Sequence, residues 1–496
     1  MDIDRSLRDN FPSIRDIFAY SPRATFFTGR GADMLVSFSV SNFRSFGEEV
    51  TLNMVASSKL TDHLNHRVPI GDTGQHLVRS AVLYGANASG KSNLIKAMEF
   101  AQRLITWPQH DRHPGVDFFR FRASPGLEPS SFEFRFLIGS RVFAYGFDIL
   151  AHRILSEWLT VAKSDDDRAV FERDSKGKVV VGPAATKELS DDETLSDTLA
   201  ALAKLSVKPH QLFLNLLTSF PEDILGETLA TVIRWLTKDL VILDPNPRAC
   251  DMLERLDRDA RFREFAAQFL NRVDTGIGGL DFERTTRECR DYERDLLPSG
   301  ARDFEFAYSY FGCAGDTDEV IDPSDPTKVI VRRLLAHHPV NRKPFPLPFS
   351  EESEGTQQLL HYMPILSSPM DRSSVVVIDE LDRSLHPLLC VELVRFFSEN
   401  CQGAKKQLIV TTHEVQLLSQ DLLRRDEYWF VEKDKTQQSR LVSLSDFNIR
   451  NDLQVRKGYL QGRFGAIPIL GSTDELNRLI NCEPGKNTNA TQEASP

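Results

Sequence analysis

The sequence predicts an α/β fold in two lobes, with an antiparallel β-subdomain and an inserted, mainly helical domain. An apolar strand, a glycine-rich loop and an amphipathic helix follow one another within residues 81–105. Two runs that alternate apolar and polar residues, 131–139 and 141–149, have the pattern of a hairpin, and apolar strands return at 373–379 and 407–412. The stretch between them, from about 164 to 328, carries helical patterns instead.

Composition and charge narrow the class of protein. The chain has 60 Lys and Arg residues and 71 Asp and Glu residues, which gives a net charge of −11. This charge excludes a protein whose whole surface is basic and binds nucleic acid, but it does not exclude a local basic face. No apolar run approaches the roughly 20 residues of a membrane helix, and the charged start is unlike a signal peptide. The six cysteines form no C-x-x-C pair, which argues against zinc and disulfide frameworks. We expect a protein of the reducing cytoplasm.

Changes of pattern set the expected domain boundaries. Because Met34 opens an alternating strand pattern, the preceding residues are expected to be an N-terminal extension, either an upstream mis-start or a loosely held arm. Helices are expected at 191–205, 251–273 and 388–398. The expected divisions are an extension at 1–33, lobe I at 34–163, an inserted mainly helical domain at 164–328, lobe II at 329–470 and a disordered tail at 471–496.

The glycine-rich loop fits the phosphate-binding pattern G-x-x-x-x-G-K-[ST] at every fixed position, and it lies between a strand and a helix as that pattern requires. Its glycines let backbone amides wrap a phosphate at a helix N-terminus. The lysine reaches the β- and γ-phosphate oxygens, and the final hydroxyl ligates Mg²⁺. The loop consists of Gly85, Ala86, Asn87, Ala88, Ser89, Gly90, Lys91 and Ser92.

Two later strands end in polar residues that suit the same site. The β-branched run at 375–378 ends in Asp379, expected to help hold Mg²⁺, and Glu380, expected to polarise the attacking water. His413 follows the next apolar strand, where a sensor of the γ-phosphate would lie. Lys91 and Asp379 are 288 positions apart, far more than a minimal phosphate-binding domain needs, which supports the expected insertion.

Further motifs carry a resemblance to a known family. They are NFRSF at 42–46, ESEGTQQLL at 352–360, DELDRSLHP at 379–387, TTHE at 411–414 and GYLQGRFGAIP at 458–468. With the phosphate-binding loop, they make residues 34 to about 470 resemble the ABC-type branch of P-loop ATPases that includes SMC and RecF proteins. More narrowly, the chain resembles the stand-alone AAA family ATPases of bacterial anti-phage systems, of the RloA/AbiLi kind.

The resemblance implies a two-lobed ABC-type P-loop ATPase head that binds ATP and Mg²⁺ and hydrolyses the β–γ phosphoanhydride. It implies that Arg44 lies near the phosphates and that Glu380, His413 and Lys91 are catalytic. It also implies a homodimer that sandwiches two ATP molecules, with Ser353 and Gly355 of one chain facing the γ-phosphate held by the other. The sequence SEGT at 353–356 departs from the transporter signature Leu-Ser-Gly-Gly-Gln, so transporter geometry does not follow.

The implied role is the sensor or regulator subunit of a bacterial anti-phage, abortive-infection system with a separately encoded effector, RloB-like or a nuclease. DNA or RNA is a further possible partner. The alternatives are a RecF-like DNA-binding clamp, for which runs such as 287–294 and Arg332–Arg333 would meet phosphates, and an ATP-gated nuclease with Glu432 and Asp434 as metal ligands. For both sets the pattern favours charged surface residues. Gln211 is a candidate Q-loop glutamine, with an ordinary helix-flanking role as the favoured alternative.

Overall fold

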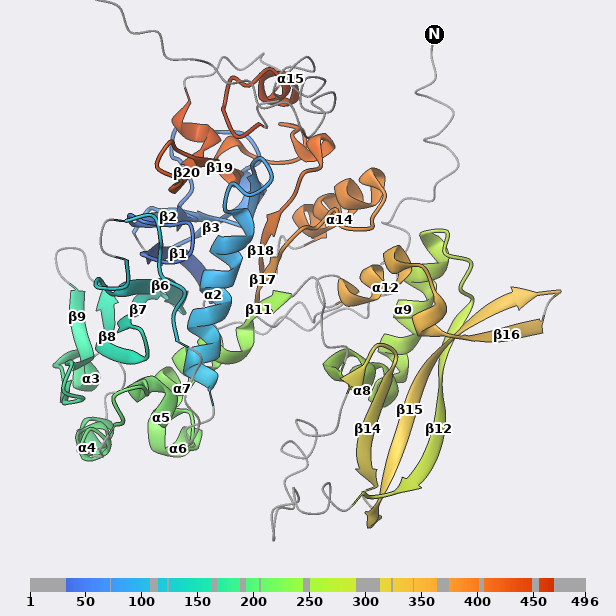
Figure 1. Cartoon of the computed structure of the whole chain (residues 1–496), viewed down its shortest axis with the longest axis horizontal. Helices are drawn as coiled ribbons and strands as arrows, with labels where there is room; N and C mark the ends of the chain where they lie inside the picture. Colours follow the sequence, from blue (N-terminus) through green and yellow to red (C-terminus); the bar gives the residue numbers. More distant parts are fainter. Residues whose placement is uncertain are drawn as a thin grey trace, which may run out of the picture.

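The computed structural model describes residues 33–467, except 72, 108–114, 123–124, 163–166, 188–192, 205–206, 244–249, 291–312, 323, 342, 364–373, 401–405 and 448–454 (Figure 1). The expected extension, apart from Asp33, and the expected tail therefore lie outside the described residues. Within the described part, no helix combines the length and apolar character needed to cross a bilayer.

A six-stranded sheet carries the phosphate-binding loop, in the order β11-β17-β18-β5-β19-β20. Its first five strands are parallel, and β20 is antiparallel to β19. Residues 374–378 are buried throughout, as a strand covered on both faces requires. The strands are β5 (Ser80–Tyr84), β11 (Leu240–Leu243), β17 (Ser374–Ile378), β18 (Lys406–Thr411), β19 (Tyr428–Lys433) and β20 (Ser439–Ser443).

A seven-stranded antiparallel sheet lies beside it, in the order β10-β9-β8-β7-β6-β1-β2 (Figure 1). The expected hairpin is confirmed, because Ile138 pairs with Arg141 and the turn uses Gly139 at φ 64°. The strands are β1 (Met34–Ser41), β2 (Val50–Asn53), β6 (Ser130–Ile138), β7 (Arg141–Leu150), β8 (Arg153–Ala162), β9 (Asp167–Arg173) and β10 (Val179–Val181). A small sheet pairs β3 (Arg67–Pro69) with β4 (His76–Val78).

Helix α2 (Lys91–Thr106) joins the two sheets into one core. Its apolar residues recur every three or four positions, so Leu94, Met98, Ala101 and Ile105 all face inward and are buried. They belong to one apolar cluster with residues of β1, β6, β7 and β17. The helix expected at residues 91–105 is therefore confirmed, and its N-terminus is fixed at the phosphate-binding loop.

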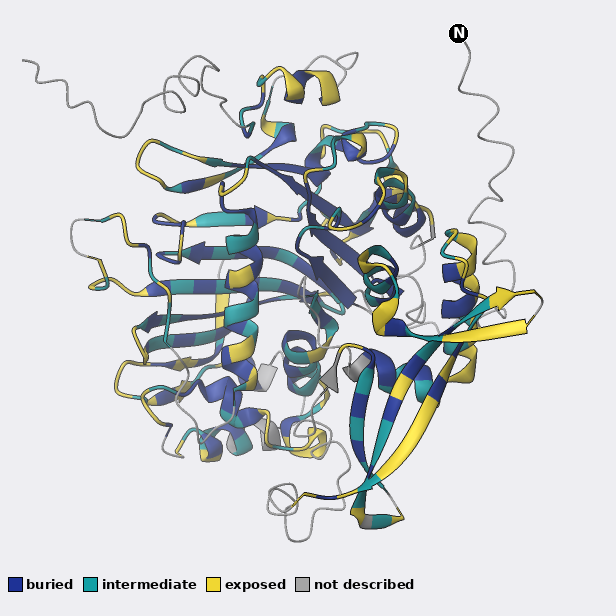
Figure 2. Ribbon diagram, turned by 45° about the vertical axis from the view of Figure 1, so that its right-hand side comes forward, coloured by how far each residue is buried: buried dark blue, intermediate teal, exposed yellow. Residues whose placement is uncertain are grey.

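A third, antiparallel sheet forms a separate layer with α8 (Cys250–Arg258) and α9 (Ala260–Arg272) (Figures 1 and 2). Asp259 separates these helices, since its carboxylate accepts from the amides of Arg261 and Phe262 and so begins a new helix within the single helical stretch expected at 251–273. The strands are β12 (Gly279–Glu288), β13 (Cys313–Ala314), β14 (Thr317–Asp322), β15 (Asp325–Val340) and β16 (Lys343–Pro348), the last largely exposed.

The segment 164–328 does not form the single, mainly helical domain that the sequence pattern predicts, because its strands belong to three different sheets. Strands β9 and β10 extend the antiparallel sheet, β11 completes the parallel sheet, and β15 runs across the expected boundary at 328. The reason is that strand pairing with distant partners, which a local pattern does not record, decides which sheet a segment joins. The helical elements here are α3 (Ala184–Lys187), α4 (Glu193–Leu202), α5 (Phe213–Leu217), α6 (Glu222–Leu225), α7 (Glu227–Arg234) and the π-helix η2 (Trp235–Asp239).

The remaining helices follow the third sheet in the chain. Helix α12 (Glu354–His361) precedes β17, and α14 (Pro387–Asn400) connects β17 to β18 as expected for a parallel pair. The chain then forms α15 (Val455–Leu460) at residues that the family resemblance assigned to a closing segment. Short 3₁₀ turns are η1 (Leu64–His66), η3 (Phe349–Glu351), η4 (Val415–Leu417), η5 (Arg425–Glu427) and η6 (Leu444–Asp446).

Candidate nucleotide site

The phosphate-binding loop connects β5 to α2 with a backbone that only small residues permit. Gly90, the N-cap of α2, has φ 115°, a conformation that L side chains rarely adopt. A Cβ at Gly85 would lie 2.5 Å from the carbonyl oxygen of Val431, and one at Gly90 would collide with the hydroxyl of Ser439. The two glycines therefore allow the loop to turn tightly against β19 and β20.

Lys91 folds its side chain back over this loop. Its ammonium donates to the carbonyl oxygens of Gly85 at 2.8 Å and Ala86 at 3.3 Å. Burial lowers the pKa of Lys91 below its usual 10.5, while the charges of Asp379, Asp382 and Glu380 oppose this shift. The loop thus holds a cation at the N-terminus of a 16-residue helix, a position that suits a phosphate.

Ser92 and Asp379 meet at the carboxyl end of the parallel sheet. The Ser92 hydroxyl donates to Asp379 Oδ1 at 3.1 Å, and the Thr411 hydroxyl donates to the same oxygen at 2.5 Å. The sheet order makes this meeting possible, because β18 lies between β5 and β17. One hydroxyl and one carboxylate beside the loop fit Mg²⁺, which typically takes few protein ligands and completes its shell with phosphates and water.

Glu380, in the turn directly after β17, is held in a strained, left-handed backbone conformation. Its φ is 55°, and its amide donates to the Thr411 hydroxyl at 2.8 Å. Within the described residues, its partly buried carboxylate has no hydrogen bond or ion pair. It is therefore free to accept a proton from a water molecule.

His413 lies one strand away from the acid pair, as the sequence predicts, because β17 and β18 are neighbours. Its amide donates to Asp382 Oδ1 at 3.1 Å, and the Thr412 hydroxyl donates to the same atom at 2.7 Å. Burial, and secondly the charge of Lys91, hold the pKa of His413 below its usual 6.5. Sequence reasoning missed the roles of Asp382 and Thr411, although both lie within the motifs it singled out.

Ser353 caps the N-terminus of α12. Its hydroxyl accepts from the Thr356 amide at 3.2 Å. A Cβ at Gly355 would lie 2.5 Å from the carbonyl oxygen of Ser384, so only glycine allows this approach. The Ser384 hydroxyl also donates to Glu354 at 3.1 Å. The N-terminus of α12 is thus packed against the turn that follows Asp379 and Glu380.

Arg44 is held by a neighbouring loop. Its guanidinium pairs with the Asp117 carboxylate at 2.8 Å, and its amide donates to the Asp117 carbonyl oxygen at 2.8 Å. The next residue, Ser45, is linked to the phosphate-binding loop through Ser439. Its hydroxyl accepts from Asn93 and from Ser439 at 2.8 Å each, and Ser439 also donates to the Ser89 carbonyl oxygen at 2.5 Å.

Gln211 does not lie at the nucleotide site. Its amide donates to Asn215, which in turn donates to the Ile105 and Trp107 carbonyl oxygens at the C-terminal end of α2. At 1.5 Å per residue, the 16 residues of α2 separate the Ile105 end from the phosphate-binding loop by roughly 20 Å. The favoured alternative, an ordinary residue flanking a helix, describes Gln211 better.

The candidate residues of the alternative functions are engaged in ordinary contacts. Asp434 caps a turn, with its carboxylate accepting from Thr436 and from the Gln438 amide. Arg332 pairs with Asp318 and Asp257, and Arg287 pairs with Glu319 and donates to the Glu288 carbonyl oxygen. Across the described ranges, no group of three His, Cys, Asp or Glu side chains is arranged to hold a metal.

Comparison with known proteins assigns the chain to a family. Residues 80–208 and 246–419 match the family model described as "AAA domain, putative AbiEii toxin, Type IV TA system". Thus the match includes the phosphate-binding loop, Asp379, Glu380 and His413. No curated protein matches the chain.

Solved structures of SMC heads also align with the chain. The SMC head domain from Thermotoga maritima has 13% identity, covering 82% of this chain and 98% of that chain with a TM-score of 0.34. An SMC head bound to the C-terminal winged-helix domain of ScpA has 14% identity, with 82% and 97% covered and a TM-score of 0.36. The Pyrococcus furiosus SMC head bound to the C-terminal domain of ScpA has 13% identity, with 83% and 96% covered and a TM-score of 0.33.

Proposed function

We propose that this chain binds and hydrolyses ATP, because it belongs to the AAA family described as putative AbiEii toxins of type IV toxin–antitoxin systems. The observation that carries the proposal is the meeting of Ser92 with Asp379 beside the Lys91 ammonium. A helix N-terminus, a buried lysine and a hydroxyl–carboxylate pair are the groups that a nucleoside triphosphate with Mg²⁺ needs.

Each residue of the loop has a role in holding the nucleotide. The Lys91 ammonium, which contacts the Gly85 and Ala86 carbonyl oxygens, would exchange them for β- and γ-phosphate oxygens. Ser92 and Asp379 would hold Mg²⁺, which neutralises charge on those oxygens. Ser45 and Ser439 support the loop, so its backbone amides are already arranged before the phosphate binds.

Hydrolysis would use Glu380 and His413. A water oxygen attacks the γ-phosphorus while its proton passes to the Glu380 carboxylate, and the bond from the γ-phosphorus to the β–γ bridging oxygen breaks to give ADP and phosphate. His413 reaches the same edge of the sheet from β18 and is uncharged at neutral pH, since its pKa is lowered. The uncharged imidazole would donate one hydrogen bond to the γ-phosphate or the water.

The assembly that we propose is a homodimer with ATP sandwiched between chains. It is supported by the capped N-terminus of α12, where Ser353 and the first-turn amides offer an anion-binding end, in a helix of eight residues. In this dimer, Ser353 of one chain would face the γ-phosphate held by Lys91 of the other. Arg44 would reach the phosphates only after leaving Asp117, so its role is the least direct of those proposed.

In the cell, we place the chain in the cytoplasm as the sensor or regulator of an anti-phage, abortive-infection system. The family description, which names an AbiEii toxin and a toxin–antitoxin system, supports this class of role. The described Cys390 is a free, buried thiol, which is compatible with a reducing compartment. A separately encoded effector, RloB-like or a nuclease, would receive the signal, and DNA or RNA would be a possible trigger.

Phosphate release from ATP with Mg²⁺ tests the enzymatic proposal directly. The wild type and Lys96→Ala, which changes an exposed lysine one turn further along α2, are expected to release phosphate at similar rates. Lys91→Ala and Glu380→Gln are expected to release almost none. Turnover in Lys91→Ala at the wild-type rate would place the catalytic site elsewhere in the chain.

A further inference from the structure

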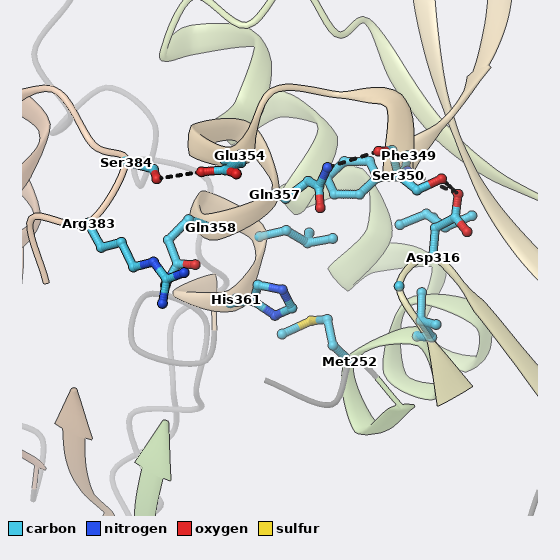
Figure 3. A pocket seen from close by; sticks show the side chains of 14 residues that line it. Met252, Asp316, Phe349, Ser350, Glu354, Gln357, Gln358, His361, Arg383 and Ser384 are labelled. Carbon is cyan, nitrogen blue, oxygen red and sulfur yellow. Dashed lines mark hydrogen bonds between the residues drawn. The ribbon is translucent and has the colours of Figure 1, made fainter. Parts of the chain in front are cut away.

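A cavity of about 330 Å³ lies where α12 meets α8 and the third sheet (Figure 3). Its volume is at the lower end of the roughly 300–1,000 Å³ typical of small-molecule sites. Figure 3 shows Arg383 at one side and Asp316 at the other, with His361 and Met252 between them. The cavity is distinct from the nucleotide site, because neither the phosphate-binding loop nor Asp379, Glu380 or His413 lines it.

Two polar side chains of this cavity lack partners within the described chain. His361, the last residue of α12, has no recorded hydrogen bond, and Arg383 has neither a hydrogen bond nor an ion pair through its guanidinium. Desolvation lowers the pKa of His361 to about 4, so its imidazole is uncharged at neutral pH and offers one donor and one acceptor. For the partly buried His361 the lack of a partner is unusual and leaves its ring nitrogens available to a ligand or water, whereas Arg383 is exposed at the mouth of the cavity.

The other polar groups of the cavity are already engaged. The Asp316 carboxylate accepts from the Ser350 amide at 3.0 Å and from its hydroxyl at 2.7 Å. Gln358 donates its amide nitrogen to the Tyr362 hydroxyl at 2.9 Å, which leaves its carbonyl oxygen available. Gln357 likewise donates only its amide N–H groups, to the Ser350 and Glu352 carbonyl oxygens. The groups without a partner are therefore one guanidinium, one imidazole and two amide carbonyls, a set that accepts an anion and a ring edge with both donors and acceptors.

Apolar side chains complete the cavity. Met252, Leu253 and Leu360 line it, and Met252, the most exposed of the three at 9%, offers the main apolar contact to a flat ring. Asp316 and Glu354 place negative charge in the same wall, which disfavours a ligand as highly charged as a triphosphate. Size, charge and wall chemistry together favour a single base, a sugar and one phosphate.

We propose that this cavity is a second ligand site, which binds a nucleoside monophosphate. The base lies against Met252 and Leu360 with its edge hydrogen-bonded to His361 and Gln358, and the phosphate pairs with Arg383. Because His361 ends the same helix that Ser353 begins, an occupied site fixes α12 against the turn at Arg383 and Ser384. The ligand would thereby set the position of Ser353, a regulatory consequence that rests on the proposed ATPase function.

Calorimetric titration of the full-length Lys91→Ala chain tests binding without interference from the phosphate-binding loop. AMP, GMP, CMP and UMP are offered singly, with ribose 5-phosphate and inorganic phosphate as probes that lack a base. At least one monophosphate is expected to bind with one site per chain, and ribose 5-phosphate at least about tenfold more weakly. Absence of binding by all four, or equal binding of ribose 5-phosphate, overturns the assignment.

Variants in the same background assign binding to the cavity. His361→Leu and Arg383→Ala are each expected to weaken binding at least about tenfold, since each removes a hydrogen-bonding group worth roughly 1.5 kcal/mol. His361→Gln keeps a donor and an acceptor and is expected to retain most of the affinity. Arg395→Ala removes an exposed arginine of α14 that pairs with Glu392 and serves as the control. Unchanged affinity in both His361→Leu and Arg383→Ala overturns the proposed site.

Two further measurements separate this proposal from the ATPase proposal. Met252→Trp fills the cavity and is expected to abolish binding; if it does not fold, His361→Leu still decides. In one outcome, a monophosphate binds the Lys91→Ala protein but the wild type releases no phosphate from ATP. This outcome supports the cavity site and rejects only its proposed regulation of the ATPase. Phosphate release by the wild type with no monophosphate bound removes the cavity site alone.

Discussion

The Ser92 hydroxyl donates to the Asp379 carboxylate at 3.1 Å, although 287 residues separate them in the chain. The two residues follow β5 and β17, which lie on either side of β18 in one parallel sheet. Carboxyl ends of parallel strands share one edge of a sheet, and ligand sites of open α/β sheets lie at that edge. The predictions below test what this meeting of distant residues does.

Lys91→Ala is expected to weaken ATP binding at least about 100-fold while the chain stays folded. The lysine is the charged donor to the phosphates, and charge-assisted hydrogen bonds are worth roughly 1.5–3 kcal/mol each. Its burial already disfavours its charge, so its removal should not lower the free energy of unfolding. Equilibrium binding of a fluorescent ATP analogue, with Lys96→Ala as the control, measures the change. Affinity within a few-fold of the wild type would reject the phosphate-binding assignment.

Glu380→Gln is expected to bind ATP normally and to hydrolyse it about 10²–10⁴ times more slowly. The amide cannot accept the proton of water, whereas Lys91, Ser92 and Asp379 still hold the nucleotide. Single-turnover hydrolysis measures the rate, and Glu392→Gln on the surface of α14 is a matched control.

The same Glu380→Gln variant should accumulate as a dimer with saturating ATP, because the nucleotide that joins the chains is not consumed. Sedimentation velocity with and without ATP measures this. A monomer under saturating ATP argues against the proposed sandwich, and full turnover moves the catalytic base to another residue.

Mixing two inactive variants tests whether Ser353 acts on the partner chain. Ser353→Arg and Lys91→Ala are each expected to be inactive, but a mixed dimer has one composite site with both changes and one with neither. Phosphate release should therefore recover in part on mixing. Mixed dimers are verified by pull-down through a tag on one variant. If verified mixed dimers stay inactive, Ser353 is only the cap of α12, worth about 1 kcal/mol of stability.

Gly90→Ala is expected to lower the free energy of unfolding by about 1–3 kcal/mol and to weaken ATP binding. The residue has φ 115°, which strains any L side chain, and a Cβ would collide with the Ser439 hydroxyl. Urea denaturation measures the stability. Gly74→Ala, where φ is 75° but the Cβ meets open space, separates the backbone strain from the collision. Equal losses in the two variants would show that the contact with Ser439 costs nothing.

The acid limb of the ATPase rate is expected to have its midpoint below pH 6.5, because the pKa of His413 is lowered by burial and by Lys91. A lowered pKa means that the imidazole remains uncharged to a lower pH than a free histidine. The rate should therefore fall to half its plateau value only at a pH below 6.5. A pH–rate profile of the wild type measures the limb, and His413→Gln should lose it together with most of the activity. An acid limb centred above pH 6.5 would contradict this role.

Much of the fold is predictable from local patterns. The hairpin at Gly139, the helix beginning at Lys91 and the strand before Asp379 all agree with the expected ranges to within about one residue. Each has a period of about 2 or 3.6 residues, or a fully apolar run, that depends only on which faces are buried. The candidate site follows for the same reason, since its residues lie where such elements end.

The contacts that complete the site are not in any local pattern. Ser439 and Ser45 support the phosphate-binding loop, although they lie 350 and 44 positions from Ser89 in the chain. Asp382, in the turn that follows β17, accepts a hydrogen bond from the His413 amide. Which strands become neighbours depends on the summed packing of the whole sheet, so these partners emerge only when the sheet is assembled.

By itself, the sequence determined the phosphate-binding loop, the acids after β17 and the histidine after β18, because each is written in adjacent residues. Only the tertiary structure decided how the segment 164–328 is shared among three sheets, that Arg44 pairs with Asp117, and that a cavity separates His361 from α8. The physical reason is that local geometry follows from neighbouring side chains. Contacts between distant segments follow instead from the balance of burial and pairing over the whole chain.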